Sequence, residues 1–256
     1  MDEEMRSLED NQTFTLTKLP EGRKTVGGRW VYSIKGDIDG HDQYKARFVA
    51  KGYSQRAGID YGETFSPTAN LTSIRVVMQK AAQDDLILHQ MDVKTAYLHA
   101  PIDREIYMEQ PEGYEKEGEK LVCKLQKSIY GLKQSGRNWN EMLHTCLVDD
   151  NFTQNPTDHC VYTKESEETG KVIVVVWVDD LIIAASNNES LEKAKNMFST
   201  RFKMKDLGRL KYFLGMDFSQ SDGYVKVSQK RYVEKILERF DMQECRIRET
   251  PRVTQS

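Results

Sequence analysis

The chain has 256 residues, of which 38% are hydrophobic and 30% are charged. This is the composition of an ordinary globular protein, so it excludes the disordered and fibrous classes. The formal net charge of −3 argues against a protein that coats nucleic acid without specificity, because such proteins are usually basic overall.

The sequence indicates neither a structural metal site nor secretion. The cysteines at positions 123, 146, 160 and 245 have neither the spacing of a zinc site nor that of a disulfide framework, which fits a reduced, intracellular setting. The acidic start MDEEMRSLEDNQ has no apolar core for a signal peptide. The longest apolar run is interrupted by aspartates, so we expect no membrane partner.

The first predicted element is a β-hairpin. Apolar and polar residues alternate over residues 28–34 and 44–50, and the segment GDIDGHD between them is rich in turn residues. Lys45, Arg47 and Lys51 would share one face of the second strand, because side chains two residues apart point the same way. This row is either a solvated strand edge protected by charge or part of a binding site, and the pattern alone favours the edge.

Helices are predicted where apolar residues recur at helical spacing, and their centres are residues 74–82, 139–147, 191–202 and 232–240. Thr72-Ser73 offers an N-cap to the first of them. A short strand over residues 86–91 meets the lone acid Asp92, with Thr95 as a possible helix cap beyond it.

Two strands are predicted over residues 172–178 and 181–185, and a second hairpin has the turn QSDG between LKYFLGMDF and YVKV. Hairpins and helices mix without the regular alternation of a doubly wound sheet. This mixture predicts the α+β class.

Two adjacent acids, Asp179 and Asp180, interrupt the most apolar run of the chain, VVVWVDDLIIAAS. A tight turn between two strands would explain them structurally, although no glycine follows to take the positive φ that such turns prefer. Alternatively, Asp92 from a neighbouring strand would complete a phosphoryl-transfer site, in which carboxylates hold two metal ions about 3.5–4 Å apart. The pattern alone favours the turn.

Five long segments in collinear order change this balance, because together they resemble the reverse transcriptase of Ty1/copia-type LTR retrotransposons. The resemblance covers about residues 10–253. The segments are YKARFVAKGYSQRAGIDYGETFSPT, LHQMDVKTAYLHAPIDREIYMEQPEGY, LVCKLQKSIYGLKQSGRNW, VVWVDDLIIAAS and FKMKDLGRLKYFLGMDF.

The resemblance implies a right-hand polymerase fold, whose palm is an antiparallel sheet with packed helices. The fingers would comprise about residues 20–85 and 104–140, the palm about 86–103 and 141–227, and a truncated thumb would begin in 228–256. The chain stops shortly after Thr250-Pro251, so we expect no RNase H, protease or integrase region. A polyprotein fragment, a truncated element copy and a host-derived gene all fit this expectation.

The resemblance also implies RNA-directed DNA polymerase activity, in which a primer 3′-hydroxyl attacks the α-phosphate of a dNTP and pyrophosphate leaves. Asp92, Asp179 and Asp180 match the three palm carboxylates of the family. Asp92 and Asp179 would be the main ligands of two Mg²⁺, which Mn²⁺ could replace. The Val93 carbonyl would help them, and Asp180 would support the site.

Other residues match the nucleotide and primer contacts of the family. Arg47 matches the fingers arginine that grips the triphosphate, with Lys45 assisting, because planar bidentate recognition of phosphate suits arginine. Tyr97 matches the aromatic residue beneath the incoming sugar, which excludes a ribose 2′-hydroxyl. The remaining matches are Tyr130 and Lys133 on the nucleotide side, and Trp177, Val178, Leu214 and Gly215 on the primer side.

Three departures from the family pattern remain. Trp177 stands where Tyr is usual and could impair extension, whereas Ser135-Gly136 and His99-Ala100 replace Ala-Pro and Asn-Gly without removing a ligand. A polymerase-fold remnant that binds nucleic acid or a partner without catalysis is the alternative. A purely structural protein would explain the turn but not five motifs.

The implied partners are an RNA or DNA template with a primer, dNTPs, and other Pol or Gag products. The implied location is cytoplasmic, within a virus-like particle, and/or nuclear.

Overall fold

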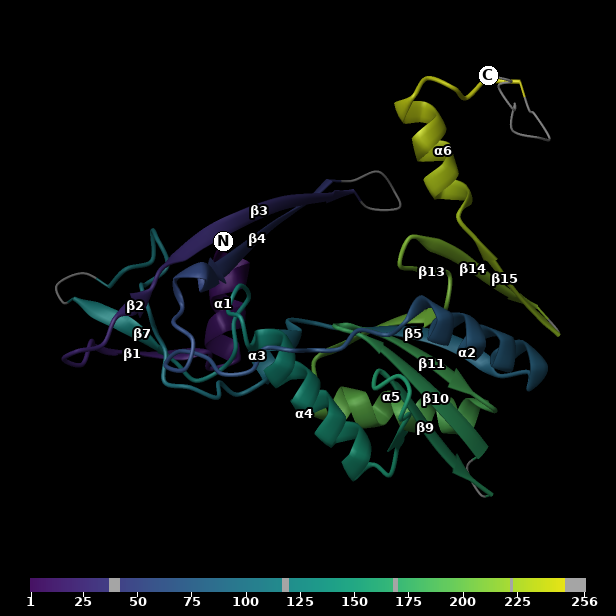
Figure 1. The fold of residues 1–256 in the computed structure, drawn as a ribbon, viewed down its shortest axis with the longest axis horizontal. Coiled ribbons are helices and arrows are strands. Elements are labelled where there is room, and N and C mark those ends of the chain that lie inside the picture. Colours follow the sequence, from purple (N-terminus) through teal and green to yellow (C-terminus); the bar gives the residue numbers. More distant parts are fainter. Residues whose placement is uncertain (37–41, 117–119, 168–169, 222, 247–256) are drawn as a thin grey trace, which may run out of the picture.

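A computed structural model of the chain describes residues 1–36, 42–116, 120–167, 170–221 and 223–246 (Figure 1). Most of the turn predicted for the first hairpin and the Thr250-Pro251 element lie outside these described residues. The described part contains strands and helices in mixed order, which confirms the α+β class.

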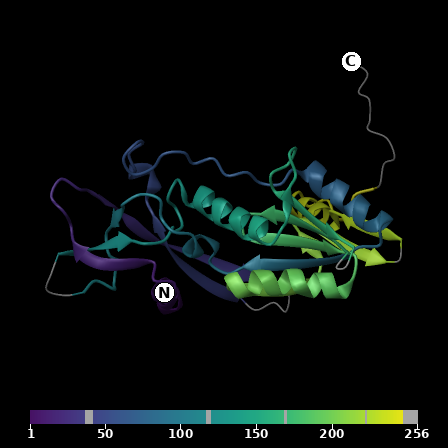
Figure 2. The same cartoon turned by 90° about the horizontal axis from the view of Figure 1, so that it is seen from below.

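The described residues form two hydrophobic cores, and the larger is built on a six-stranded antiparallel sheet. Its strands, in spatial order, are β12 (Met204–Arg209), β5 (Ile87–Val93), β11 (Asp180–Ala185), β10 (Gly170–Trp177), β9 (Val161–Ser166) and β8 (Thr153–Gln154). Helix α5 (Asn188–Arg201) lies on one side of the sheet, and α2 (Leu71–Gln83) and α4 (Ser135–Asp149) lie on the other (Figure 2). Residues 172–176 and 181–185 are all buried, because helices cover both faces of the two central strands.

The start of α2 differs from the sequence prediction. The helix begins at Leu71 after the N-cap Asn70, so Thr72-Ser73 lies inside it, and the side chain of Asn70 makes no capping bond. The carboxylate of Asp158 accepts a hydrogen bond from the Asn70 amide instead, at 2.8 Å. This acceptor, 88 residues away along the chain, satisfies one of the backbone donors that the helix start leaves without an intrahelical partner.

The smaller core lies beside a four-stranded sheet in the order β1 (Phe14–Lys18), β7 (Leu121–Leu125), β6 (Tyr107–Met108) and β2 (Thr25–Val26). The N-terminal helix α1 (Asp2–Asp10), which the sequence analysis missed, inserts Leu8 into this core. The long hairpin of β3 (Gly28–Gly36) and β4 (Asp42–Ala50) is confirmed, and a turn of 3₁₀ helix (Gly52–Ser54) follows it. The short helix α3 (Ala96–His99) contributes residues to both cores.

The C-terminal elements extend from the larger core. The second predicted hairpin is confirmed as β14 (Met216–Ser221) and β15 (Tyr224–Ser228). Its first strand is predicted over the whole of LKYFLGMDF, but a turn divides that segment into β13 (Tyr212–Phe213) and β14, which pair with each other. Helix α6 (Lys230–Arg239) projects away from both cores, and none of its residues is buried (Figure 1).

The division into fingers, palm and thumb stays a prediction. Helix α2 lies within the segment assigned to the fingers, yet Ile74, Val77, Met78 and Ala81 pack into the larger core. The helices of the described part include none that is long and apolar enough to cross a membrane.

Candidate active site

The acidic turn joins β10 to β11, and its position differs by one residue from the predicted one. Trp177 pairs with Asp180, so Val178 and Asp179 form the reversal and Asp180 is already the first residue of β11. Val178 has φ of +56°, whereas Asp179 does not have a positive φ. This is the pattern of a type II′ turn, in which glycine is preferred at the first central position. A β-branched residue there costs roughly 1–3 kcal/mol of strain.

Strand register places two of the three predicted catalytic acids side by side. Asp180 pairs with Asp92 of β5, and residues directly opposite in an antiparallel pair point to the same face. Trp177 pairs with Asp180 on the other side, and Lys205 of β12 pairs with Asp92. One row across four strands is therefore Trp177, Asp180, Asp92 and Lys205. Lys205, which the sequence analysis did not single out, places a cation beside the acids.

Neighbouring groups hold the acidic turn. The Val93 amide donates to the carbonyl of Asp179 at 2.8 Å, which fastens the turn to the end of β5. The indole N–H of Trp139, on α4, donates to the carbonyl of Val178 at 2.6 Å. Gln90 donates from Nε2 to Oδ1 of Asp180 at 3.2 Å. The backbone of the turn is thus fixed from two different elements.

Three of the predicted nucleotide-binding residues gather beside the turn. The guanidinium carbon of Arg47 lies 4.7 Å from the ring centroid of Tyr130, and the rings of Tyr130 and Tyr97 are 4.9 Å apart, edge to face. Burial raises the pKa of Tyr130 to about 12, with Arg47 opposing the shift and Asp179 adding to it. Burial also raises the pKa of Tyr97, and the charge of Asp179 adds to this shift. Both phenols are therefore neutral near pH 7, and the negative charge of Asp179 raises the pKa of each.

Two glycines allow this contact between the hairpin and the Tyr130 loop. Gly131 has φ of +92°, and a Cβ there would lie 2.2 Å from the Ala50 carbonyl oxygen. A Cβ on Gly52 would lie 2.1 Å from the carbonyl oxygen of Gly131. The Ala50 amide can therefore donate to the Tyr130 carbonyl at 2.7 Å, which brings the strand of Arg47 against Tyr130.

The other predicted cations are arranged differently. Lys45 shares a face of β4 with Arg47, as predicted, but β4 ends at Ala50, so Lys51 lies outside the row. Lys133 is exposed, and its ammonium nitrogen lies 5.3 Å from the ring centroid of Tyr61. The structure thus brings Lys45 near Arg47 along one strand, whereas Lys133 contacts a different aromatic residue.

The predicted primer-side residues occupy turns and the rim of the larger core. Leu214 and Gly215 form the two-residue turn between β13 and β14, and both have positive φ, the pattern of a type I′ turn. Trp177 and Leu214 are half-buried and pack against the larger core. Thr95 precedes α3 as predicted, but its side chain does not cap that helix.

The donor chemistry fits Mg²⁺, although the three acids do not form a closed cage. Across the described residues, no group of three or more His, Cys, Asp and Glu side chains is arranged to hold a metal ion. Mg²⁺ prefers oxygen ligands and is usually held by one or two carboxylates together with substrate phosphates. Asp92 and Asp180 on one face, with Asp179 at the adjacent turn, supply such a partial set. The assignment of individual ligands stays a prediction.

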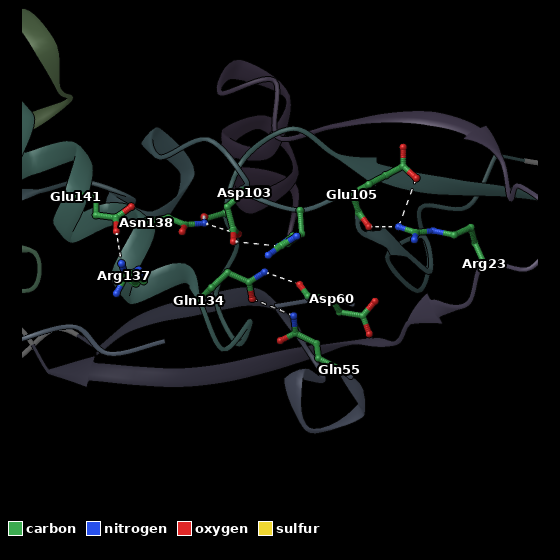
Figure 3. A network of polar contacts seen from close by, with 11 residues as sticks. Arg23, Gln55, Asp60, Asp103, Glu105, Gln134, Arg137, Asn138 and Glu141 are labelled. Atoms are coloured by element: carbon green, nitrogen blue, oxygen red, sulfur yellow. Dashed lines mark hydrogen bonds and ion pairs between the residues drawn. The ribbon is translucent and has the colours of Figure 1, made fainter. Parts of the chain in front are cut away.

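A polar network fixes the segment that leads into α4 (Figure 3). Gln134 accepts from Gln55 at 3.0 Å and donates to the backbone carbonyl of Asp60 at 2.8 Å. One turn further, Asn138 donates to Asp103 at 3.2 Å. Because Gln134 and Asn138 are buried, these bonds hold the start of α4 in one position relative to its neighbours.

The chain matches the sequence profile of the family described as "Reverse transcriptase (RNA-dependent DNA polymerase)" over residues 11–254. It is 42% identical over 255 residues to the Retrovirus-related Pol polyprotein from transposon TNT 1-94 of Nicotiana tabacum, covering 98% of this chain and 19% of the relative. The corresponding protein from transposon RE1 of Arabidopsis thaliana is 38% identical over 247 residues, covering 94% and 17%.

A Transposon Ty1-DR4 Gag-Pol polyprotein of Saccharomyces cerevisiae is 28% identical over 238 residues, covering 89% of this chain and 14% of the relative. The chain thus spans about a fifth or less of the length of these relatives.

Proposed function

Because the chain belongs to the reverse transcriptase family of Ty1/copia-type Pol polyproteins, we propose that it catalyses RNA-directed DNA synthesis. The observation that carries the proposal is the strand register that sets Asp92 beside Asp180, next to the turn of Asp179. Adjacent carboxylates at the end of a buried sheet repel one another, and a bound divalent cation offsets that repulsion.

The acids act as ligands in this proposal. Asp92 and Asp179 hold two Mg²⁺, with the Val93 carbonyl helping and Asp180 in support. When bound, such ions activate the primer 3′-hydroxyl and stabilise the leaving oxygen during transfer of the nucleotidyl group. The sheet contributes rigidity, because Asp92 and Asp180 lie on paired strands and the Val93 amide fixes the carbonyl of Asp179.

Arg47 orients the triphosphate of the incoming dNTP. Its guanidinium lies over the ring of Tyr130, and this contact holds the planar group in one orientation. Arg47 therefore loses less side-chain conformational freedom when it binds the phosphates. Lys45, two residues earlier on the same face, adds positive charge for the phosphates. Lys133, on the same loop as Tyr130, is the weaker candidate because its ammonium lies over Tyr61.

Tyr97 and the primer-side residues define the geometry of the reacting groups. Tyr97 lies against Tyr130 and near Asp179, where its ring forms the floor beneath the sugar and excludes a 2′-hydroxyl. Trp177, Val178, Leu214 and Gly215 contact the primer end. The substrates are therefore an RNA or DNA template with a primer and the four dNTPs, and other Pol or Gag products are candidate partners.

Primer extension on poly(rA)/oligo(dT) with Mg²⁺ or Mn²⁺ tests the proposal. The wild-type chain should incorporate dTTP, and Asp179→Asn should abolish incorporation while duplex binding, measured by fluorescence anisotropy, is retained. Asp10→Asn, at an exposed acid of α1, is the matched control and should extend normally. Duplex binding without extension by the wild type would instead indicate a remnant that binds nucleic acid without catalysis.

A further inference from the structure

The acidic turn needs an external restraint, because its backbone is strained. Val178 is β-branched and has a positive φ of 56°, a conformation that persists only where the surroundings determine it. One restraint is the Val93 amide on the carbonyl of Asp179, which continues the pairing of the sheet. The other is the indole N–H of Trp139 on the carbonyl of Val178, at 2.6 Å, and it comes from a different layer of the fold.

Trp139 is itself held in place on all sides. Its side chain is 2% exposed, and its ring centroid lies 5.1 Å from that of Phe202 in an edge-to-face contact. The His99 ring lies 6.3 Å from Trp139 and 5.5 Å from Phe202. His99 comes from α3 and Phe202 is the residue after α5, so two other parts of the fold position the indole that α4 carries.

The helix that carries Trp139 is also fixed at its start. The bonds of Gln134 and Asn138 hold the start of α4, as Figure 3 shows, and Asn138 directly precedes Trp139. The indole is therefore a rigid donor rather than a mobile side chain that happens to find an acceptor. A buried indole N–H requires some acceptor, and here the acceptor belongs to the peptide that joins Val178 to Asp179.

We propose that Trp139 is a positioning residue for nucleotidyl transfer, because its hydrogen bond fixes the peptide between Val178 and Asp179 and so fixes the carboxylate of Asp179. This inference rests on the proposed function. Rotation of that peptide would turn the backbone on the N-terminal side of Asp179 and move its carboxylate relative to Asp92. A displacement of about 1 Å at a reacting centre can lower the rate about 100-fold.

Two replacements separate the hydrogen bond from the packing. Trp139→Phe keeps an aromatic ring and removes the donor, and benzothienylalanine at position 139 keeps the size of the indole but lacks its N–H. Trp30→Phe is the matched control, because the indole of Trp30 also donates to a backbone carbonyl, that of Glu112 at 3.0 Å, away from the acidic turn. Both Trp139 replacements should lower kcat for single-nucleotide incorporation about 10- to 100-fold, with the KM for dNTP changed less than about 3-fold. The control should leave kcat unchanged.

Hydrogen exchange of the Val93 amide is the second measurement, because that amide donates to the carbonyl of Asp179. This measurement does not depend on catalytic activity. Exchange should quicken in both Trp139 replacements and stay as in wild type in Trp30→Phe. Unchanged kcat together with unchanged exchange at Val93 would overturn the role of Trp139. A wild-type chain that never extends a primer would refute the proposed function instead, and faster exchange in the replacements would still show that Trp139 holds the turn.

Discussion

Replacement of Asp158 by Ala should destabilise the protein more than any surface charge change. Its side chain is almost fully buried, at 6% exposure, and its carboxylate accepts from the amides of Asn70 at 2.8 Å and Cys160 at 3.0 Å. Hydrogen bonds to charged groups contribute about 1.5–3 kcal/mol each, and loss of a helix cap costs about 0.5–2 kcal/mol. Because water can reach part of the vacated space, we expect a loss of roughly 2–4 kcal/mol in the free energy of unfolding.

Urea unfolding followed by circular dichroism measures this loss, and Tm should fall by roughly 4–16 °C for a domain of this size. The control is Asp150→Ala, whose half-exposed carboxylate pairs with Lys164 at 2.8 Å and should contribute less than about 1 kcal/mol. Equal losses in the two variants would refute the assignment of Asp158 as the cap of α2.

The same variant has a pH signature. Burial raises the pKa of Asp158, but hydrogen bonds from Ser73, Asn70 and Cys160 outweigh burial, so the pKa lies below its ordinary value of 3.8. The ionised carboxylate therefore stabilises the fold fully above pH 3.8, and this contribution is lost as pH falls through the lowered pKa. The difference in unfolding free energy between wild type and Asp158→Ala should shrink below about pH 4.

Three further predictions concern the site and its support. Arg47→Lys should raise the KM for dNTP about 10-fold in steady-state extension, since it loses bidentate phosphate contact, whereas Arg29→Lys on β3 should not. Val178→Gly should change the free energy of unfolding by less than about 1 kcal/mol, because the relief of backbone strain offsets the greater conformational entropy that glycine loses on folding. The same variant should lower kcat, because the turn becomes mobile, and an unchanged kcat would contradict this. Burial lowers the pKa of His99, so the fold should lose stability as pH falls below the ordinary value of 6.5, and His99→Gln should flatten this part of a pH series of unfolding midpoints.

The sequence was sufficient for the features that depend on local pattern. Continuous apolar runs predicted the strands that flank the acids, helical spacing predicted α4 and α5, and the motifs predicted the family. The exception is the two-residue turn of Leu214 and Gly215, which divides a segment predicted as one strand. Local patterns succeed here because the residues on the buried face of a helix or strand recur in the sequence with the period of that element.

Features that depend on tertiary contacts could not be predicted. Asp158 caps a helix 88 residues away, and Trp139 donates to a carbonyl 39 residues away, and no local signal links either pair. Lys205 lies beside Asp92 only because β12 pairs with β5. The turn was misplaced by one residue for a related reason: Asp is the better turn former, but register and these distant hydrogen bonds place Val178 at the strained position.

Manganese binding measures the central claim most directly, that Asp92 and Asp179 hold divalent ions beside the incoming nucleotide. Electron paramagnetic resonance can count bound Mn²⁺ in a complex of the chain with a dideoxy-terminated primer–template and dNTP. The account predicts two ions per wild-type chain, fewer in Asp92→Asn and Asp179→Asn, and two again in Asp10→Asn. The same number of ions in all four proteins would contradict it.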